Sequence, residues 1–134
     1  MPNRVVHFEM QAKDKDRAKK FYTEAFGWKM EEMGGEYGNY VVMQSGDPMP
    51  DPKDHGINGG MIPVQDKQWN AFSCTISVDD IEKAVSDIKT AGGTILDGPM
   101  DIPSIGKYAL CKDTEDNFFS ILQPSEEMLE EKAN

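Results

Sequence analysis

The sequence predicts an α+β fold of two tandem βαβββ modules, with the helices outside and a cleft between two curved mixed sheets. Apolar and polar residues alternate strictly over residues 5–12, and an amphipathic helix pattern follows directly. The same unit then recurs, because residues 7–28 align without a gap with residues 73–94. Two copies of strand–helix–strand–strand–strand are the simplest description of this repeat.

Composition limits the classes of protein that the chain can represent. It has 134 residues, of which 38% are hydrophobic, so it can bury a core as one structural domain. The net charge of -10 provides no basic surface for nucleic acid and disfavours anionic membranes. No apolar run approaches the roughly 18 residues of a membrane span, and no signal-peptide pattern is present. Cys74 and Cys111 form no CxxC motif. We therefore expect a cytoplasmic protein with two buried, reduced thiols.

The first module is expected over residues 1–64, beginning with a strand from Val5 to Ala12. Phe8 and its apolar neighbours face a core, whereas His7 and Glu9 share the opposite face. Asp14 can cap the following helix, and Gly27 can end it. The apolar stripe of this helix is formed by Ala18, Phe21, Tyr22 and Ala25.

The rest of the first module reads as three strands. Residues 28–33 and 37–44 are expected to form two of them, joined at Gly34-Gly35. Residues 45–59 form a proline-containing loop whose length is typical either of a functional loop or of a surface excursion. Residues 60–64 form a short strand, and Pro63 places it at a sheet edge. Residues 65–70 link the two modules.

The second module is expected over residues 71–123. A strand over residues 72–78 leads to a helix that Asp79 or Asp80 caps and that Gly92-Gly93 ends. Strands follow over residues 94–97, 107–112 and 118–123, with a loop over residues 98–106 and a turn over residues 113–117. Residues 124–134 form a short C-terminal helix or tail. In this arrangement the polar residues of both first strands line the cleft.

Several short motifs resemble one protein family. In the first half they are His7-Phe8-Glu9, Asp16-Arg17-Ala18, Phe21-Tyr22 and Phe26-Gly27-Trp28. In the second half they are Ser77-Val78-Asp79-Asp80, Ala91-Gly92-Gly93, Ile102-Pro103-x-x-Gly106 and Lys112-Asp113-x-x-x-Asn117-x-Phe119. Together they resemble the vicinal oxygen chelate superfamily, which holds glyoxalase I, bleomycin- and fosfomycin-resistance proteins and extradiol dioxygenases. The resemblance covers nearly the whole chain.

This resemblance implies a divalent metal bound by residues of the first, fourth, fifth and eighth strands. The corresponding positions here are His7, a residue near Gly60, Ser73 and Ser120. A divalent site needs three or four nitrogen, carboxylate or thiolate donors, and only His7 is of the required type. We therefore expect a member with a degenerate metal site and no metal cofactor. The alternative is a Zn, Ni, Fe or Mn site with an altered ligand set around His7 and Glu9.

The roles of the cleft residues remain open at this point. His7 can act as an acid or base, because histidine exchanges protons near neutral pH; it can also be a pocket wall or a packed remnant. Glu9 can assist in catalysis or pair with a hydroxyl group, for which Thr75 is a candidate. The candidate ligand-binding residues are Trp28, Tyr40, Met61, Ser73, Thr75, Tyr108 and Ser120.

The resemblance implies a glyoxalase/bleomycin-resistance-like protein that binds a small organic molecule in the inter-module cleft. The alternative is a metal-dependent glyoxalase-like lyase or a related enzyme. Sheet edges and inter-module surfaces in such folds commonly pair, so we expect a homodimer. A purely structural dimerisation role is disfavoured by the polar faces.

Overall fold

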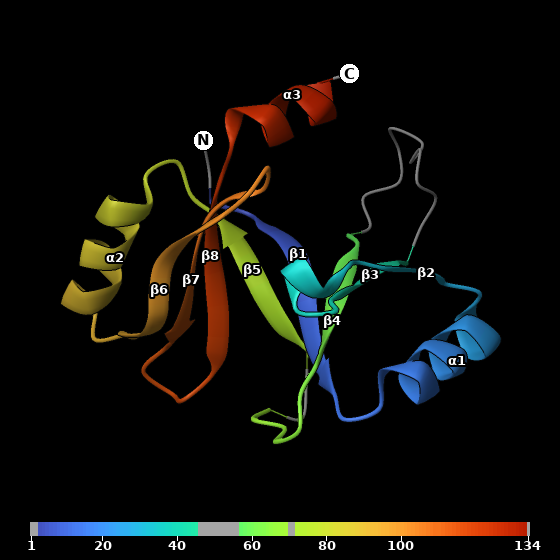
Figure 1. Ribbon diagram of the computed structural model, residues 1–134. Helices are drawn as coiled ribbons and strands as arrows, with labels where there is room; N and C mark the ends of the chain where they lie inside the picture. Colours follow the sequence, from blue (N-terminus) through green and yellow to red (C-terminus); the bar gives the residue numbers. More distant parts are fainter. Residues whose placement is uncertain (1–2, 46–56, 70–71, 134) are drawn as a thin grey trace. The chain divides into compact units, whose positions relative to one another are not determined.

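The computed structural model describes residues 3–45, 57–69 and 72–133. The chain forms two compact units: His7–Phe72, called here the first module, and Ser73–Asn134 together with the residues before His7, called here the second module. Each module contains one strand, one helix and three further strands in that order (Figure 1). The predicted α+β class with two βαβββ modules is thus confirmed, whereas the cleft between them stays a prediction.

The sheet of the first module has the order β2-β3-β4-β1. Strand β1 runs parallel to β4, and β3 is antiparallel to both β4 and β2. The strands are β1 (Val5–Ala12), β2 (Lys29–Glu32), β3 (Val41–Gln44) and β4 (Gly59–Pro63). The N-terminal strand therefore begins and ends where the alternation of apolar and polar residues predicted.

Strand β4 is an inner strand, which corrects its expected edge position. It lies between β3 and β1, and Pro63 is its last residue. Its lack of an N–H group costs little there, because the next N–H, of Val64, donates to the carbonyl of Ala12 at 2.9 Å. The joint between β2 and β3 is also longer than expected, since it contains the 3₁₀ turn η1 (Gly35–Tyr37). Most of the predicted loop over residues 45–59 lies outside the described residues.

Helix α1 (Lys15–Phe26) covers one face of the first sheet and has the predicted ends. The Asp14 side chain accepts a hydrogen bond from the N–H of Arg17, and Gly27 closes the helix with φ of 72°. Lys15 and Lys19 both pair with Glu32 of β2 at 3.3 and 3.1 Å, which ties the helix to the sheet. The core beneath contains Phe8, Ala12, Val41, Met43 and Met61.

The sheet of the second module has the order β5-β8-β7-β6. Its strands are β5 (Ser73–Ser77), β6 (Thr94–Ile102), β7 (Gly106–Lys112) and β8 (Phe118–Pro124). Strand β6 continues through residues that the sequence assigned to a loop. It accommodates Gly98 and Pro99 through irregular register between Ile95 and Met100, and Gly98 has φ of 92°.

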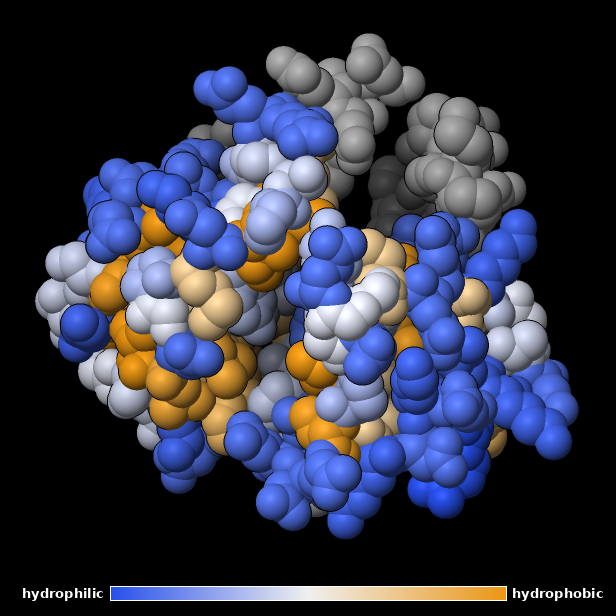
Figure 2. Space-filling model, viewed as in Figure 1, coloured by the Kyte–Doolittle hydropathy of each residue, from blue (hydrophilic) through white to orange (hydrophobic). Residues whose placement is uncertain are grey.

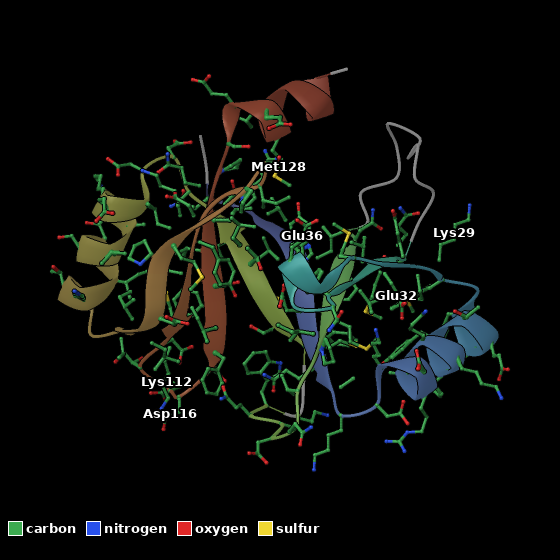
Figure 3. All side chains as sticks on the ribbon, in the orientation of Figure 1. Lys29, Glu32, Glu36, Lys112, Asp116 and Met128 are labelled. Carbon is green, nitrogen blue, oxygen red and sulfur yellow. The ribbon has the colours of Figure 1, made fainter. Side chains whose placement is uncertain are left out.

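Helix α2 (Ile81–Thr90) packs more closely on its sheet than α1 does. Asp80, not Asp79, caps it by accepting from the N–H groups of Glu82 and Lys83. Ile81 is fully buried in a core that also contains Val78, Ala109, Cys111 and Ile121. The chain ends in helix α3 (Glu126–Ala133), where the N–H of Met128 donates to the Ser125 hydroxyl group (Figure 3).

On the face shown in Figure 2, hydrophilic residues predominate, and apolar residues form patches between them. No helix in the described part of the chain is long and apolar enough to cross a membrane. The expectation of two buried thiols is half correct. Cys111 is buried, and burial raises its pKa to about 11, so it stays a neutral thiol; Cys74 is exposed.

Candidate functional site

His7 and Glu9 lie on the same face of β1 because residues i and i+2 of a strand point the same way. Phe8 between them points to the opposite face and is buried in the core of the first module. The next residue on the polar face, Gln11, is held in place. Its side-chain oxygen accepts from the N–H groups of Gln68 and Trp69 at 2.7 and 3.4 Å. The polar face of β1 is thus well defined by local structure.

The hydroxyl group of Tyr40 connects His7 and Glu9. It lies 2.8 Å from Nε2 of His7 and donates to Oε1 of Glu9 at 2.7 Å. Nε2 and Oε1 are themselves 3.4 Å apart, so the three polar atoms form a compact triangle. The His7 and Glu9 side chains are 31% and 17% exposed, which leaves the triangle open to small molecules. We call this group the His7–Tyr40–Glu9 triangle.

The triangle fixes the protonation of the histidine ring. A phenol has one hydrogen, and that of Tyr40 is donated to the Glu9 carboxylate. The Tyr40 oxygen can then only accept from His7, so Nε2 of His7 carries a proton. In neutral His7 the free lone pair is therefore on Nδ1, to which no hydrogen bond is made by any residue that the structure describes. The site offers a hydrogen-bond acceptor, or a base, at that atom.

Gly60 makes room for the Tyr40 hydroxyl group. Residue 60 is aligned with both Glu9 of β1 and Val42 of β3, so it lies beside the triangle. A Cβ at this position would collide with the Tyr40 hydroxyl oxygen. The position that the resemblance assigned to a fourth-strand metal ligand is thus filled by a phenol from a neighbouring segment. The sequence pointed to Tyr40 as a pocket residue but gave no signal that it bridges His7 and Glu9.

The residues present do not fit the metal site of the resemblance. Residues 60, 73 and 120 are glycine and serine, which offer no imidazole, carboxylate or thiolate. Within the described ranges, no group of three or more His, Cys, Asp and Glu side chains is placed to hold an ion. The phenol oxygen also lies within 2.8 Å of both candidate donors, where an ion shared by them would be coordinated.

The candidate residues Ser73, Thr75 and Ser120 of the second module carry neutral hydroxyl groups. Thr75 and Ser120 are aligned partners on β5 and β8, and their hydroxyl oxygens are 2.7 Å apart. Ser73 donates to the carbonyl of Phe118 at 3.3 Å. All three are buried. Glu9 and Thr75, considered as partners on sequence grounds, therefore each have another partner, and the hydroxyl groups of this set are largely satisfied.

Three other candidate residues are each placed within their own module. Trp28 stacks on Tyr22 with ring centroids 5.1 Å apart and contacts Phe8, so it belongs with the aromatic residues near α1. Met61 is fully buried in the same core. Tyr108 is half-buried on β7, where it is aligned with Leu122. A ligand-binding role for these residues stays a prediction.

Comparison with known proteins places the chain in a family. A sequence model described as Glyoxalase/Bleomycin resistance protein/Dioxygenase superfamily matches residues 4–121. A Mycobacterium bovis protein named "Putative glyoxylase CFP32" is 30% identical over 124 residues. That alignment covers 90% of this chain but 44% of the relative, so the chain spans less than half of that protein. A "Glyoxylase-like domain-containing protein" of Didymella fabae is 28% identical, covering 87% of this chain and 91% of the relative.

Solved structures share the fold at low sequence identity. Methylmalonyl-CoA epimerase from Mycobacterium tuberculosis aligns with a TM-score of 0.66 and 11% identity, covering 94% of this chain and 91% of that chain. A methylmalonyl-CoA epimerase in complex with methylmalonyl-CoA and NH4+ gives a TM-score of 0.67 and 15% identity, covering 96% and 99%. At these identities the similarity shows the fold and not the reaction.

Proposed function

Because the chain belongs to the Glyoxalase/Bleomycin resistance protein/Dioxygenase superfamily, we propose that it binds a small organic molecule at the His7–Tyr40–Glu9 triangle without the standard divalent metal. The observation that carries this proposal is the phenol oxygen of Tyr40, which bridges His7 and Glu9 and fills the space above Gly60. Small-molecule sites use a small number of placed polar groups for orientation and specificity, and the triangle supplies three such groups.

The hydrogen-bond directions define what the ligand must provide. Nδ1 of neutral His7 accepts a hydrogen bond, so a ligand hydroxyl or ammonium group can donate to it. When a proton arrives at Nδ1, the ring becomes positive, and Glu9 balances that charge through the Tyr40 hydroxyl group. The triangle can therefore stabilise a transferred proton, which is the requirement for general base chemistry at a ligand carbon or oxygen. Binding is the function proposed, and proton transfer is the reaction that the site would support.

A metal-dependent lyase remains the second candidate, and one distance favours it. Nε2 of His7 and Oε1 of Glu9 are 3.4 Å apart. Two donors at about 2.1 Å from one ion lie about 3.0 to 3.4 Å apart. In that case Tyr40 would have to leave its present position or become a ligand, and further donors would be required. Metal content is therefore the measurement that separates the two candidates.

The experiment starts with protein purified without chelator or affinity metal. Bound metal is measured by mass spectrometry, and thermal shifts are recorded with a panel of small carbonyl compounds, carboxylic acids and zwitterionic amines. We expect substoichiometric metal, and we expect one class of compound to stabilise the wild type. His7→Ala and Tyr40→Phe should each lower the affinity for that compound about tenfold or more. Cys74→Ser, at an exposed residue, should leave the affinity unchanged.

The opposite result is equally definite. Stoichiometric Zn, Ni, Fe or Mn that is lost in His7→Ala would overturn the metal-free proposal in favour of the lyase. Ligand binding that is unchanged in both His7→Ala and Tyr40→Phe would move the site away from the triangle. As part of the same proposal, the protein is cytoplasmic and homodimeric, which fractionation and sedimentation would test.

A further inference from the structure

We propose that the groove between α1 and the first sheet is a second binding site, which takes an amphiphilic anion with an aliphatic chain and a carboxylate head. The groove has a volume of about 560 Å³, within the range of small-molecule sites. Its lining residues come only from the first module: Met10, Gln11, Ala12, Lys13, Asp14, Arg17, Ala18, Phe21, Tyr22, Met61, Lys67 and Phe72. None of His7, Glu9 and Tyr40 is among these lining residues, so this site is distinct from the triangle.

The apolar part of the groove is incompletely covered. Helix α1 has no buried residue, although it lies over a sheet. Phe21 on the helix is 57% exposed, and Phe72, which also lines the groove, is 55% exposed. Met10 and Met61 line the same space, and methionine adapts readily to the shape of an aliphatic chain. An alkyl chain in this groove would remove apolar surface from water, which favours binding.

The charges around the groove determine the head group. Lys13, Arg17 and Lys67 line it, on a chain whose net charge is -10. Asp14 is the one acidic lining residue, and its carboxylate already caps α1. Lys13 and Lys67 form no ion pair with any residue in the described ranges, in contrast to Lys15 and Lys19, which pair with Glu32. A carboxylate would supply the missing counter-charge.

The repeat provides a matched groove of different charge. The equivalent space beneath α2 has a volume of about 530 Å³ and an apolar floor that includes Ile76, Val78 and Ile121. In the alignment of the repeats Lys13 corresponds to Asp79, and Phe21 corresponds to Asp87. The cation at the position of Arg17 is Lys83, which pairs with Asp87 at 2.9 Å. The second groove thus has a similar size and floor but an acidic rim, and it should reject the same anion.

The proposal is tested by measuring the binding of sodium decanoate with isothermal titration calorimetry, at concentrations well below the critical micelle concentration of decanoate. We expect one saturable site per chain, with decanol and decyltrimethylammonium bound at least tenfold more weakly. The charge-reversed variant Lys13→Glu/Lys67→Glu should lower the affinity for decanoate about tenfold or more, since two exposed cations are lost. Lys83→Glu in the second groove is the matched control and should leave the affinity unchanged. Circular dichroism would verify that the variants fold.

Other outcomes would overturn the proposal. Equal binding of decyltrimethylammonium and decanoate, or equal loss in Lys83→Glu, would contradict a cationic site in the first groove. If decanoate does not bind and Lys13→Glu/Lys67→Glu instead abolishes self-association in sedimentation, the groove holds a second copy of the chain. If the charge-reversed variant does not fold, the milder variant Lys13→Gln/Lys67→Gln is measured in its place. An unchanged affinity for decanoate in that variant would also contradict the proposal.

Discussion

The two modules share a scaffold but carry different chemistry on their polar strand faces. In the first module, His7 and Glu9 are titratable, partly exposed and joined by the Tyr40 hydroxyl group. In the second, the aligned positions are Ser73 and Thr75, which are buried and neutral, and Thr75 bonds to Ser120. The two copies of the repeat share an aspartate N-cap and an apolar core, and they differ on the polar strand face. On this strand face the first module thus carries two titratable side chains, and the second carries neutral hydroxyl groups.

The two helices also differ in how deeply their residues are buried, and this difference predicts the largest effect on stability. Ile81 begins α2 and is fully buried, whereas the aligned residue of α1 is Lys15. Ile81→Ala should lower the free energy of unfolding by about 2 to 5 kcal/mol, because it leaves a cavity. Phe21→Ala on α1 should cost less than about 1.5 kcal/mol, because Phe21 is 57% exposed. Urea unfolding of both variants would measure these free energies of unfolding. Equal decreases in the two variants would contradict the difference in packing between the helices.

A smaller effect is expected at the hydrogen-bonded pair of the second module. Thr75→Val leaves the buried Ser120 hydroxyl group without its partner and should cost about 1 to 3 kcal/mol. Adding Ser120→Ala should recover part of that loss, because no unpaired hydroxyl group then remains. Tyr40→Phe in the first module should cost at most about 1 kcal/mol, since water can reach its partly exposed partners.

A double-mutant cycle in urea would give the coupling energy between Thr75 and Ser120. Additive losses from Thr75→Val and Ser120→Ala would show that the two hydroxyl groups act independently. A larger loss from Tyr40→Phe than from Thr75→Val would reverse the comparison. It would mean that the triangle serves stability in preference to ligand binding.

The smallest effect concerns pH and the turn between β7 and β8. The pKa of Asp113 is lowered, first by the hydrogen bond from the Asn117 side chain and then by the N–H groups of Asn117 and Glu115. Folding therefore favours the ionised form. The stability that it contributes is present above the unfolded pKa of about 3.9 and is lost as pH falls through the lower folded value.

Asp113→Asn should accordingly reduce the melting temperature slightly at neutral pH, and the two melting curves should converge in acid. Calorimetry from pH 7 to pH 2.5 would measure this. Asp116, which pairs with Lys112 at 3.2 Å in the same turn, provides the control variant Asp116→Asn (Figure 3). A difference between wild type and Asp113→Asn that widens as pH falls would show the opposite sign of linkage.

Much of the fold followed from short stretches of sequence. Asp14 and Asp80 cap their helices, and Gly27 ends α1 in the left-handed conformation, because these preferences act within one turn of a helix. The strand over Val5–Ala12 followed from its alternation. Two local rules failed where sheet pairing overrode them. Pro63 ends an inner strand, and β6 passes through Gly98 and Pro99 with an irregular register.

The sequence by itself determined that His7 and Glu9 share a face, because neighbours two residues apart on a strand must point the same way. It also determined the family and the shortage of metal ligands. Only the tertiary structure decided that Tyr40 joins them. That contact depends on β4 lying between β3 and β1, with Gly60 aligned to both Glu9 and Val42. Such a register is set by packing between segments far apart in the chain, which no local pattern encodes.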